Sequence, residues 1–183
     1  MEHLTTEQLE AGLDNILQSP KSEGPLALIV RRPAVGQREE LVSAHLDIVE
    51  GLVGDNWLIR GCSSTEDGSA HPDMQLNIMN VRVTDLVAGQ QRDRWSLAGD
   101  QLYVDLDLSD ENLPAGTQLA IGKAVIEVTA EPHTGCKKFV ERFGLDAMKF
   151  VNSGLGKQIN LRGINAKVVQ AGQISTGDLV RKV

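Results

Sequence analysis

Aromatic residues are scarce in this chain: three Phe, two Trp and one Tyr make up 3% of its 183 residues. A core must therefore be built mainly from Val, Leu, Ile and Ala, which favours a strand-rich interior. Cysteine is rare as well. The two cysteines, Cys62 and Cys136, are far apart in the sequence, so the chain has neither a disulfide framework nor a Cys-x-x-Cys zinc motif.

Long apolar runs are missing too. The longest strongly apolar run, Leu26 to Val30, is too short to cross a bilayer. The first residues, Met-Glu-His-Leu-Thr-Thr-Glu, lack the basic region and the apolar run of a secretory signal, so we expect a cytoplasmic protein with no membrane partner. A net charge of −7 would repel phosphates and argues against nucleic acid as a partner. The sequence contains no Gly-x-Ser-x-Gly elbow, phosphate loop or dinucleotide fingerprint.

The length and the 41% hydrophobic content fit one compact domain with a short extension. Residues 5 to 18 are expected to be helical, because Thr5-x-x-Gln8 can form a capping box and apolar residues recur on one face. Ser19-Pro20 ends that helix. We therefore expect an N-terminal helical extension over residues 1–22 and a single domain over residues 23–183.

From Leu26 onward the pattern predicts short strands separated by glycine-bearing turns, with a few helices. The fold class expected is mainly β with a few short helices, that is, α+β. Along 101–108 we expect one apolar and one solvated face, and residues 60–73 form a long polar loop. Strands are expected at 26–31, 41–49, 74–80, 101–108, 117–121, 124–129, 164–170 and 179–183, and helices at 81–88, 137–143 and 145–151.

Cys136 stands where a strand is expected to end and a helix to begin. One interpretation is structural: the thiol begins a buried stripe with Phe139, Val140 and Phe143. The other is chemical. The helix start and the basic residues nearby favour a thiolate, which binds metals and attacks sulfur, and His133, Lys137 and Lys138 are costly neighbours for a merely packed thiol.

Other residues offer a second group of candidates. Arg162 and Gly163 precede a strand and suit an anion site. An equal alternative is a loop-to-strand entry whose arginine is solvated or pairs with a carboxylate. Arg32, in Arg31-Arg32-Pro33, can add positive charge to the same anion site. Asp55 follows Gly54 in a turn. In the polar loop, Cys62, His71 and Asp73 are possible metal ligands, but their spacing matches no standard site.

Several segments, in order, resemble the MOSC domain family, named for the C-terminal domain of molybdenum cofactor sulfurase. Gly51-Leu-Val-Gly-Asp55 resembles its Gly-Leu-x-Gly-Asp element, and Leu113-Pro-Ala-Gly-Thr-Gln-Leu-Ala-Ile-Gly122 resembles its approach to a hairpin. Residues 124–139 resemble the strand that leads to the family's cysteine. Arg162-Gly-Ile-Asn-Ala-Lys-Val and the following residues to Asp178 resemble the family's closing segment. The resemblance covers about residues 26–183.

This resemblance implies a β-barrel in which Cys136 binds the molybdenum of a pterin cofactor or carries activated sulfur. In cofactor-binding members, basic side chains and backbone amides contact the pterin phosphate. The residues that match those roles here are Arg162 and Gly163, with Lys137, Lys138, His133, Asp55 and Arg32 as further cofactor-binding candidates. A thiolate is a soft ligand that suits such a metal.

The resemblance also sets the function hypotheses. The leading one is molybdenum cofactor binding, with reduction of N-hydroxylated substrates or handling of the cofactor, for which a separate reductase would donate electrons. An alternative is a sulfur carrier with a Cys136 persulfide, loaded by a separate cysteine desulfurase. A third is a barrel that binds another small anion. It follows from two departures, His133-Thr-Gly-Cys136 for the family's Arg-x-Pro-Cys and Gly99-Asp-Gln-Leu102 for its Gly-Glu-Asn-Leu.

Overall fold

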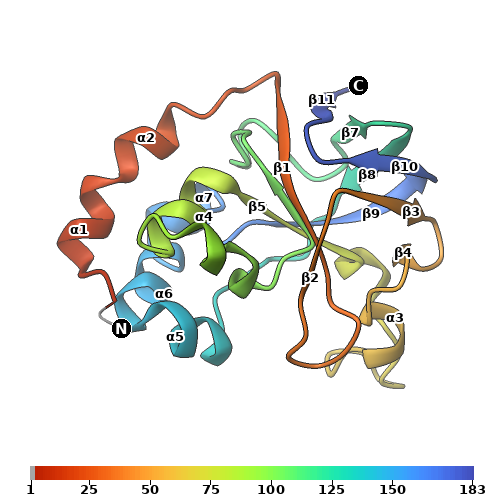
Figure 1. Ribbon diagram of the computed structural model, residues 1–183, viewed down its shortest axis with the longest axis horizontal. Coiled ribbons are helices and arrows are strands. Elements are labelled where there is room, and N and C mark those ends of the chain that lie inside the picture. Colours follow the sequence, from red (N-terminus) through yellow and green to blue (C-terminus); the bar gives the residue numbers. More distant parts are fainter. Residues whose placement is uncertain (1–2) are drawn as a thin grey trace.

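The computed structural model describes residues 3–183, and its centre is a closed seven-stranded β-barrel (Figure 1). The strands follow one another around the barrel in the order β11-β7-β8-β9-β5-β6-β1, and pairing of β1 with β11 closes the ring. All neighbours are antiparallel except β5 and β6. The seven are β1 (Glu23–Arg31), β5 (Leu76–Asn80), β6 (Leu102–Val104), β7 (Gln118–Ile121), β8 (Ala124–Val128), β9 (Ile164–Gln170) and β11 (Leu179–Lys182). The expected α+β, MOSC-type barrel is therefore confirmed.

Two smaller pieces extend the barrel. Strand β2 (Glu39–Leu41) pairs with the far end of β1, and a separate sheet has the order β10-β3-β4. Its strands are β3 (Ser43–Asp47), β4 (Gly51–Leu52) and β10 (Gly172–Ser175). The single strand predicted at 41–49 was therefore wrong, because β2 ends at Leu41 and β3 begins at Ser43 in a different sheet. Strand β10 was not predicted. The hairpin of β7 and β8 with its two-residue turn is confirmed.

The helices gather mainly on one side of the barrel, whereas the small sheet lies on the other (Figure 1). The sequence predicted α4, α5 and α6 to within about one residue and missed α3 and α7. None of the helices in residues 3–183 is long and apolar enough to span a membrane. The helices are α1 (Thr6–Ala11), α2 (Leu13–Leu17), α3 (Trp57–Arg60), α4 (Val81–Val87), α5 (Lys137–Phe143), α6 (Leu145–Val151) and α7 (Gly154–Gln158), with 3₁₀ helices at Pro72–Met74 and Arg92–Ala98.

Alternate residues of the barrel strands feed two hydrophobic cores. On β6, Leu102 and Val104 point into the barrel cluster, and Tyr103 joins a second cluster between the barrel and the helices. The solvated face predicted for residues 101–108 is therefore wrong, because helices cover that side. The strand also ends early, at Val104, although Leu106 and Leu108 remain in the barrel core. The side chains of the first cluster fill the interior of this small barrel.

The N-terminal helices pack on the second core. The predicted capping box is present between Thr5 and Gln8, and Leu9 is fully buried in the cluster. The predicted continuous helix is instead divided at Gly12, where an added Cβ would lie 2.5 Å from Leu86 Cδ1. The domain boundary that we expect between residues 22 and 23 stays a prediction.

Candidate functional site

Cys136 is the N-cap of α5, at the end of a loop over residues 129–135. The loop is anchored at both ends. Asn165 Nδ2 donates to the Glu131 carbonyl (3.1 Å), and the Asn152 side chain exchanges hydrogen bonds with the Gly135 backbone (2.9 and 3.2 Å). The Cys136 side chain itself is exposed, so its interpretation as a packed helix-start residue is wrong.

A cavity of about 170 Å³ opens beside Cys136, and we call it the basic cavity. None of the described residues in its wall is Asp or Glu, although the whole chain carries a net charge of −7. Its cationic lining residues are Arg32, Arg38, Arg60, Lys138, Arg142 and Arg162. Positive charge is therefore concentrated here against the overall balance of the protein.

One of these arginines, Arg32, is held by Asp55 from behind the wall. Its Nε and Nη2 donate to the two carboxylate oxygens of Asp55 at 2.9 and 2.8 Å, and both side chains are buried. Nη1 donates to Asn77 Oδ1 (2.9 Å) and to the Gly99 carbonyl (3.0 Å). Such a bidentate pair fixes the guanidinium as part of the wall.

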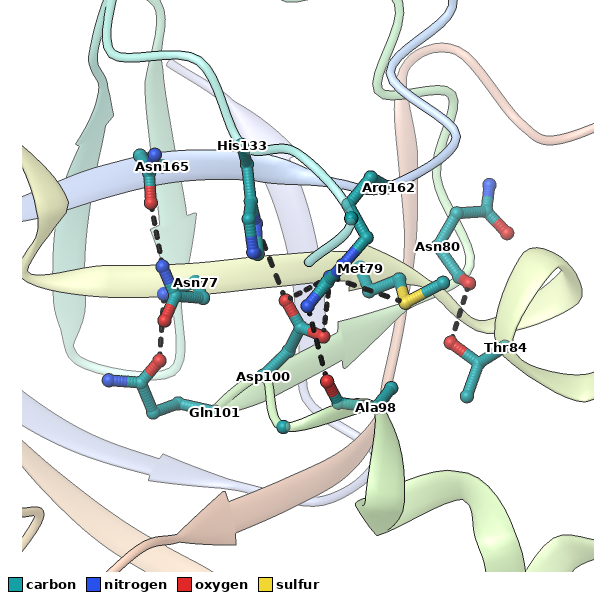
Figure 2. A network of polar contacts seen from close by, with 12 residues as sticks. Asn77, Met79, Asn80, Thr84, Ala98, Asp100, Gln101, His133, Arg162 and Asn165 are labelled. Carbon is teal, nitrogen blue, oxygen red and sulfur yellow. Dashed lines mark hydrogen bonds and ion pairs between the residues drawn. The ribbon is translucent and has the colours of Figure 1, made fainter. Parts of the chain in front are cut away.

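Arg162 is held by Asp100 through a single guanidinium nitrogen, as Figure 2 shows. Its Nη1 lies 2.9 and 2.8 Å from the two oxygens of Asp100, and Nη2 donates to the Ala98 carbonyl (3.1 Å). The guanidinium carbon also lies 5.1 Å from the centre of the Phe139 ring. Burial raises the pKa of Asp100, and the Arg162 charge opposes that shift.

His133 lies on the other side of Asp100, with Nδ1 3.5 Å from Asp100 Oδ1 (Figure 2). Burial, followed by the charges of Arg162 and Arg32, lowers the pKa of His133 well below its usual value. The imidazole is therefore neutral at neutral pH. It places a hydrogen-bonding group at the cavity wall without adding charge.

The remaining cations of the basic cavity have no carboxylate partner among the described residues. Arg38 donates only to the Gln37 carbonyl, at 2.6 Å, and Arg142 to the Leu97 carbonyl, at 2.6 Å. Burial lowers the pKa values of Arg38 and Arg60, with smaller contributions from neighbouring arginines. Of the six cations, two are balanced by Asp55 and Asp100, which leaves four uncompensated. A site with this excess attracts anions.

Buried polar atoms that lack a partner also cluster here. Five such side-chain atoms occur in residues 3–183, and four of them belong to residues that line the basic cavity. The fifth, the Tyr103 hydroxyl, lies close enough to Arg162 and Arg38 for their charges to influence its pKa. The four are Arg38 Nε, Asn56 Oδ1, His133 Nδ1 and Arg162 Nε. Buried polar groups normally have partners, so their concentration marks incomplete polar bonding at this site.

The predicted site residues do not all line the basic cavity. Cys136, Lys138, His133, Arg32 and Arg162 line the basic cavity together. Asp55 lies behind the wall as the partner of Arg32, and the exposed Lys137 is not part of the lining.

Gly163 has a structural role. With φ at 109°, an added Cβ would lie 2.1 Å from the Ile78 carbonyl oxygen, so glycine lets β9 begin directly against β5.

The sequence places Arg142 among the basic residues near Cys136, on the same short helix, but we did not predict it as a cofactor-binding residue. Neither Arg38 nor Arg60 has neighbours in the sequence that indicate a site. Arg38 lies in the loop after β1, and Arg60 is the last residue of α3. Only the tertiary fold brings them to the cavity.

The polar loop does not form the metal site considered from its sequence. No group of three His, Cys, Asp or Glu side chains in residues 3–183 is arranged to hold a metal ion. Asp73 instead lies 3.4 Å from Lys167 Nζ, and His71 Nε2 lies 3.8 Å from Glu131 Oε1. Cys62 Sγ is 2.9 Å from Ser64 Oγ.

In a comparison with known families, the model of the MOSC domain matches residues 66–181. This range contains Cys136, His133 and Arg162 but not Arg32 or Arg38. No protein of curated function matches the sequence significantly.

Solved structures show the same fold at low sequence identity. The YuaD protein from Bacillus subtilis has a TM-score of 0.66 at 16% identity, covering 86% of this chain and 94% of that one. YiiM from Escherichia coli has a TM-score of 0.56 at 21% identity, covering 88% and 69%. YiiM from Geobacillus stearothermophilus has a TM-score of 0.51 at 14% identity, covering 90% and 74%. These likenesses concern the fold alone.

Proposed function

This chain belongs to the MOSC domain family, and from that premise we propose that it binds molybdenum cofactor in the basic cavity. The observation that carries the proposal is the exposed thiol of Cys136 at a cavity with four uncompensated positive charges. The family is associated with this cofactor or with sulfur chemistry. The geometry supports the first of these because the thiol offers a ligand for a soft metal and the uncompensated cations beside it attract an anion.

The residues present fit such a group. Cys136 offers a soft sulfur ligand that is free and exposed and makes no capping hydrogen bond to α5. Arg38, Arg60 and Arg142 would hold the phosphate end, since guanidinium groups match phosphate geometry, and Lys138 would add a positive point charge. Arg32 and Arg162 would keep the wall in place through their buried carboxylates.

When bound, the cofactor would supply oxygen-atom transfer at the metal, which suits removal of oxygen from N-hydroxylated substrates. The part played by the chain is to bind and to orient. His133 would donate or accept one hydrogen bond at the wall without adding charge. A separate reductase would have to bring electrons, because the sequence has no flavin or iron–sulfur motif.

A second function, sulfur transfer, is favoured by the exposure of Cys136. A thiol that accepts sulfur from a cysteine desulfurase must reach the active site of that enzyme, and an exposed N-cap residue can do so. Neighbouring cations would favour the anionic persulfide. In this version the protein is a carrier and the arginines bind the molecule that receives the sulfur.

Metal analysis of protein made in a host that synthesises the cofactor tests the proposal. We expect bound molybdenum and pterin in the wild-type protein and in Cys62→Ser, and loss of the metal in Cys136→Ser. Wild-type protein without molybdenum and pterin would contradict the proposal. A Cys136 persulfide detected by mass spectrometry in metal-free protein would support sulfur transfer instead.

Anion binding is measured separately by calorimetry with inorganic phosphate. Arg38→Gln and Arg60→Gln should each weaken binding about tenfold or more, because a hydrogen bond to a charged group contributes about 1.5–3 kcal/mol. Arg31→Gln is the matched control, since Arg31 already pairs with Glu39 outside the cavity. Phosphate binding without molybdenum or persulfide would identify a barrel that binds another small anion.

A further inference from the structure

A second cavity, of about 590 Å³, lies beside the basic cavity and is the larger of the two. We call it the apolar cavity because aliphatic side chains make up much of its wall. It extends from the approach to the β7–β8 hairpin, past the 129–135 loop, to α7 and the start of β9. The aliphatic lining residues include Leu113, Val128, Pro132, Val151 and Ile164. Its size and lining are those of sites for small organic molecules.

The two cavities share a wall. His133 and Arg162 line both, whereas Cys136 lines only the basic cavity. The loop that carries His133 is tied at Glu131 by Asn165 and at Gly135 by Asn152. These anchors hold His133 between the cavities, with Arg162 fixed beneath by Asp100. A molecule in the apolar cavity would therefore lie next to the contents of the basic cavity.

Charge distinguishes the two cavities. Two cations, Arg162 and Lys157, and two anions, Asp110 and Glu131, line the apolar cavity, so its lining residues have no net charge. Three of these four lie toward solvent; only Arg162 is deeply buried, and it is already paired. An ionic ligand would lose its hydration, and the solvent-facing charges of the wall would compensate for that loss only weakly because water screens them. An uncharged ligand avoids that cost and gains from contact with the aliphatic wall.

We propose that the apolar cavity binds an uncharged, mainly apolar small molecule whose hydrogen-bonding end lies at the shared wall, against His133. The imidazole of His133 lines both cavities, and its side chain is 13% exposed, so it can offer a hydrogen bond at that wall. As a binding site the cavity is independent of the function proposed above. Its role as the substrate chamber, with the substrate's polar end turned toward the basic cavity, rests on that function.

Three ring compounds of the same shape test the proposal: benzamide, benzoate and benzamidine, which are neutral, anionic and cationic. Each is titrated into ¹⁵N-labelled, cofactor-free protein, and amide shifts are followed by NMR. Gly156 and Gly163 report on the apolar cavity, and Gly36 and Gly99 on the basic cavity. We expect benzamide to shift the first pair and to bind there at least fivefold more tightly than either ion.

Two exposed alanines provide matched variants. Ala115→Trp should fill the mouth of the apolar cavity and weaken benzamide binding at least tenfold, with phosphate binding unchanged. Ala34→Trp, at the basic cavity, should do the reverse. The proposal is overturned if benzamide leaves Gly156 and Gly163 unshifted, if an ion binds there as tightly, or if Ala115→Trp has no effect. Loss of molybdenum binding alone would overturn the proposed function and not this one.

Discussion

At the scale of single residues, the site depends on two buried ion pairs, Arg32 with Asp55 and Arg162 with Asp100. In each pair, the charge of one residue stabilises the buried charge of the other. Asp100 is completely buried, and Arg162 is its nearest cation. Taking either charge out of water is expensive, and only the partner together with the surrounding carbonyls compensates for it. The pair therefore fixes geometry at the wall, and it makes each of the two residues sensitive to loss of the other.

Arg162→Leu should lower the free energy of unfolding by about 3–5 kcal/mol, because it leaves the Asp100 carboxylate buried without its partner. Urea denaturation measures the change. The control is Arg31→Leu, which breaks the exposed pair with Glu39 and should cost no more than about 1 kcal/mol. Equal costs for the two variants would mean that burial of the Asp100 pair is not what makes Arg162 important.

Local sequence could not decide the state of Cys136. Phe139 and Phe143 are buried, as the helical spacing predicts, and their ring centres are 4.9 Å apart. Cys136 begins the same spacing but lies outside the packed stripe, since it is the N-cap and its backbone is extended. Periodicity describes positions within a helix and not the residue that precedes it.

At the scale of elements, close approach of backbones sets the position of β9 and therefore of Arg162. Strand β9 pairs with β5 from Ile164 onward, and Gly163 faces the Ile78 carbonyl at the point where the pairing begins. A side chain there would push the two strands apart. Arg162 precedes that contact, so the glycine helps to place it beneath the basic cavity.

Gly163→Ala should destabilise the protein by about 3–5 kcal/mol, the sum of a left-handed backbone cost and a severe steric overlap. Gly177→Ala is the matched control: its φ of 95° is also positive, but nothing lies within 4 Å of the added Cβ. It should cost only about 1–2 kcal/mol. Thermal and urea unfolding of the two variants give the difference, and a Gly163→Ala protein as stable as Gly177→Ala would refute the steric argument.

At the scale of the whole molecule, the two hydrophobic cores stabilise different parts of the fold. The barrel core closes the seven strands, and the second core joins the helices, including α5 with Cys136 at its start, to the outside of the barrel. Leu9 brings the N-terminal helices into the second core, where α1 contacts α6. The extension thus supports the layer that carries the cysteine.

Leu9→Ala should lower the stability of the entire protein by about 2–5 kcal/mol, the usual cost of truncating a fully buried leucine. Leu17→Ala, in the next helix, should change it by less than about 0.5 kcal/mol because Leu17 is 54% exposed. Chemical denaturation followed by circular dichroism measures both. A Leu9 variant with wild-type stability would show that the extension is not part of the cooperative unit.

The sequence by itself determined the family and those local elements that depend on neighbouring residues. Gly144 separated the helices at 137–143 and 145–151, the two-residue turn identified the β7–β8 hairpin, and ordered motifs indicated the MOSC barrel. These features depend on neighbours along the chain. The burial of Tyr103, the pairing of Arg162 with Asp100 and the meeting of Arg38, Arg60 and Cys136 were decided only by the tertiary structure. Burial and charge balance depend on distances between residues that are remote in sequence, and closure of the barrel sets those distances.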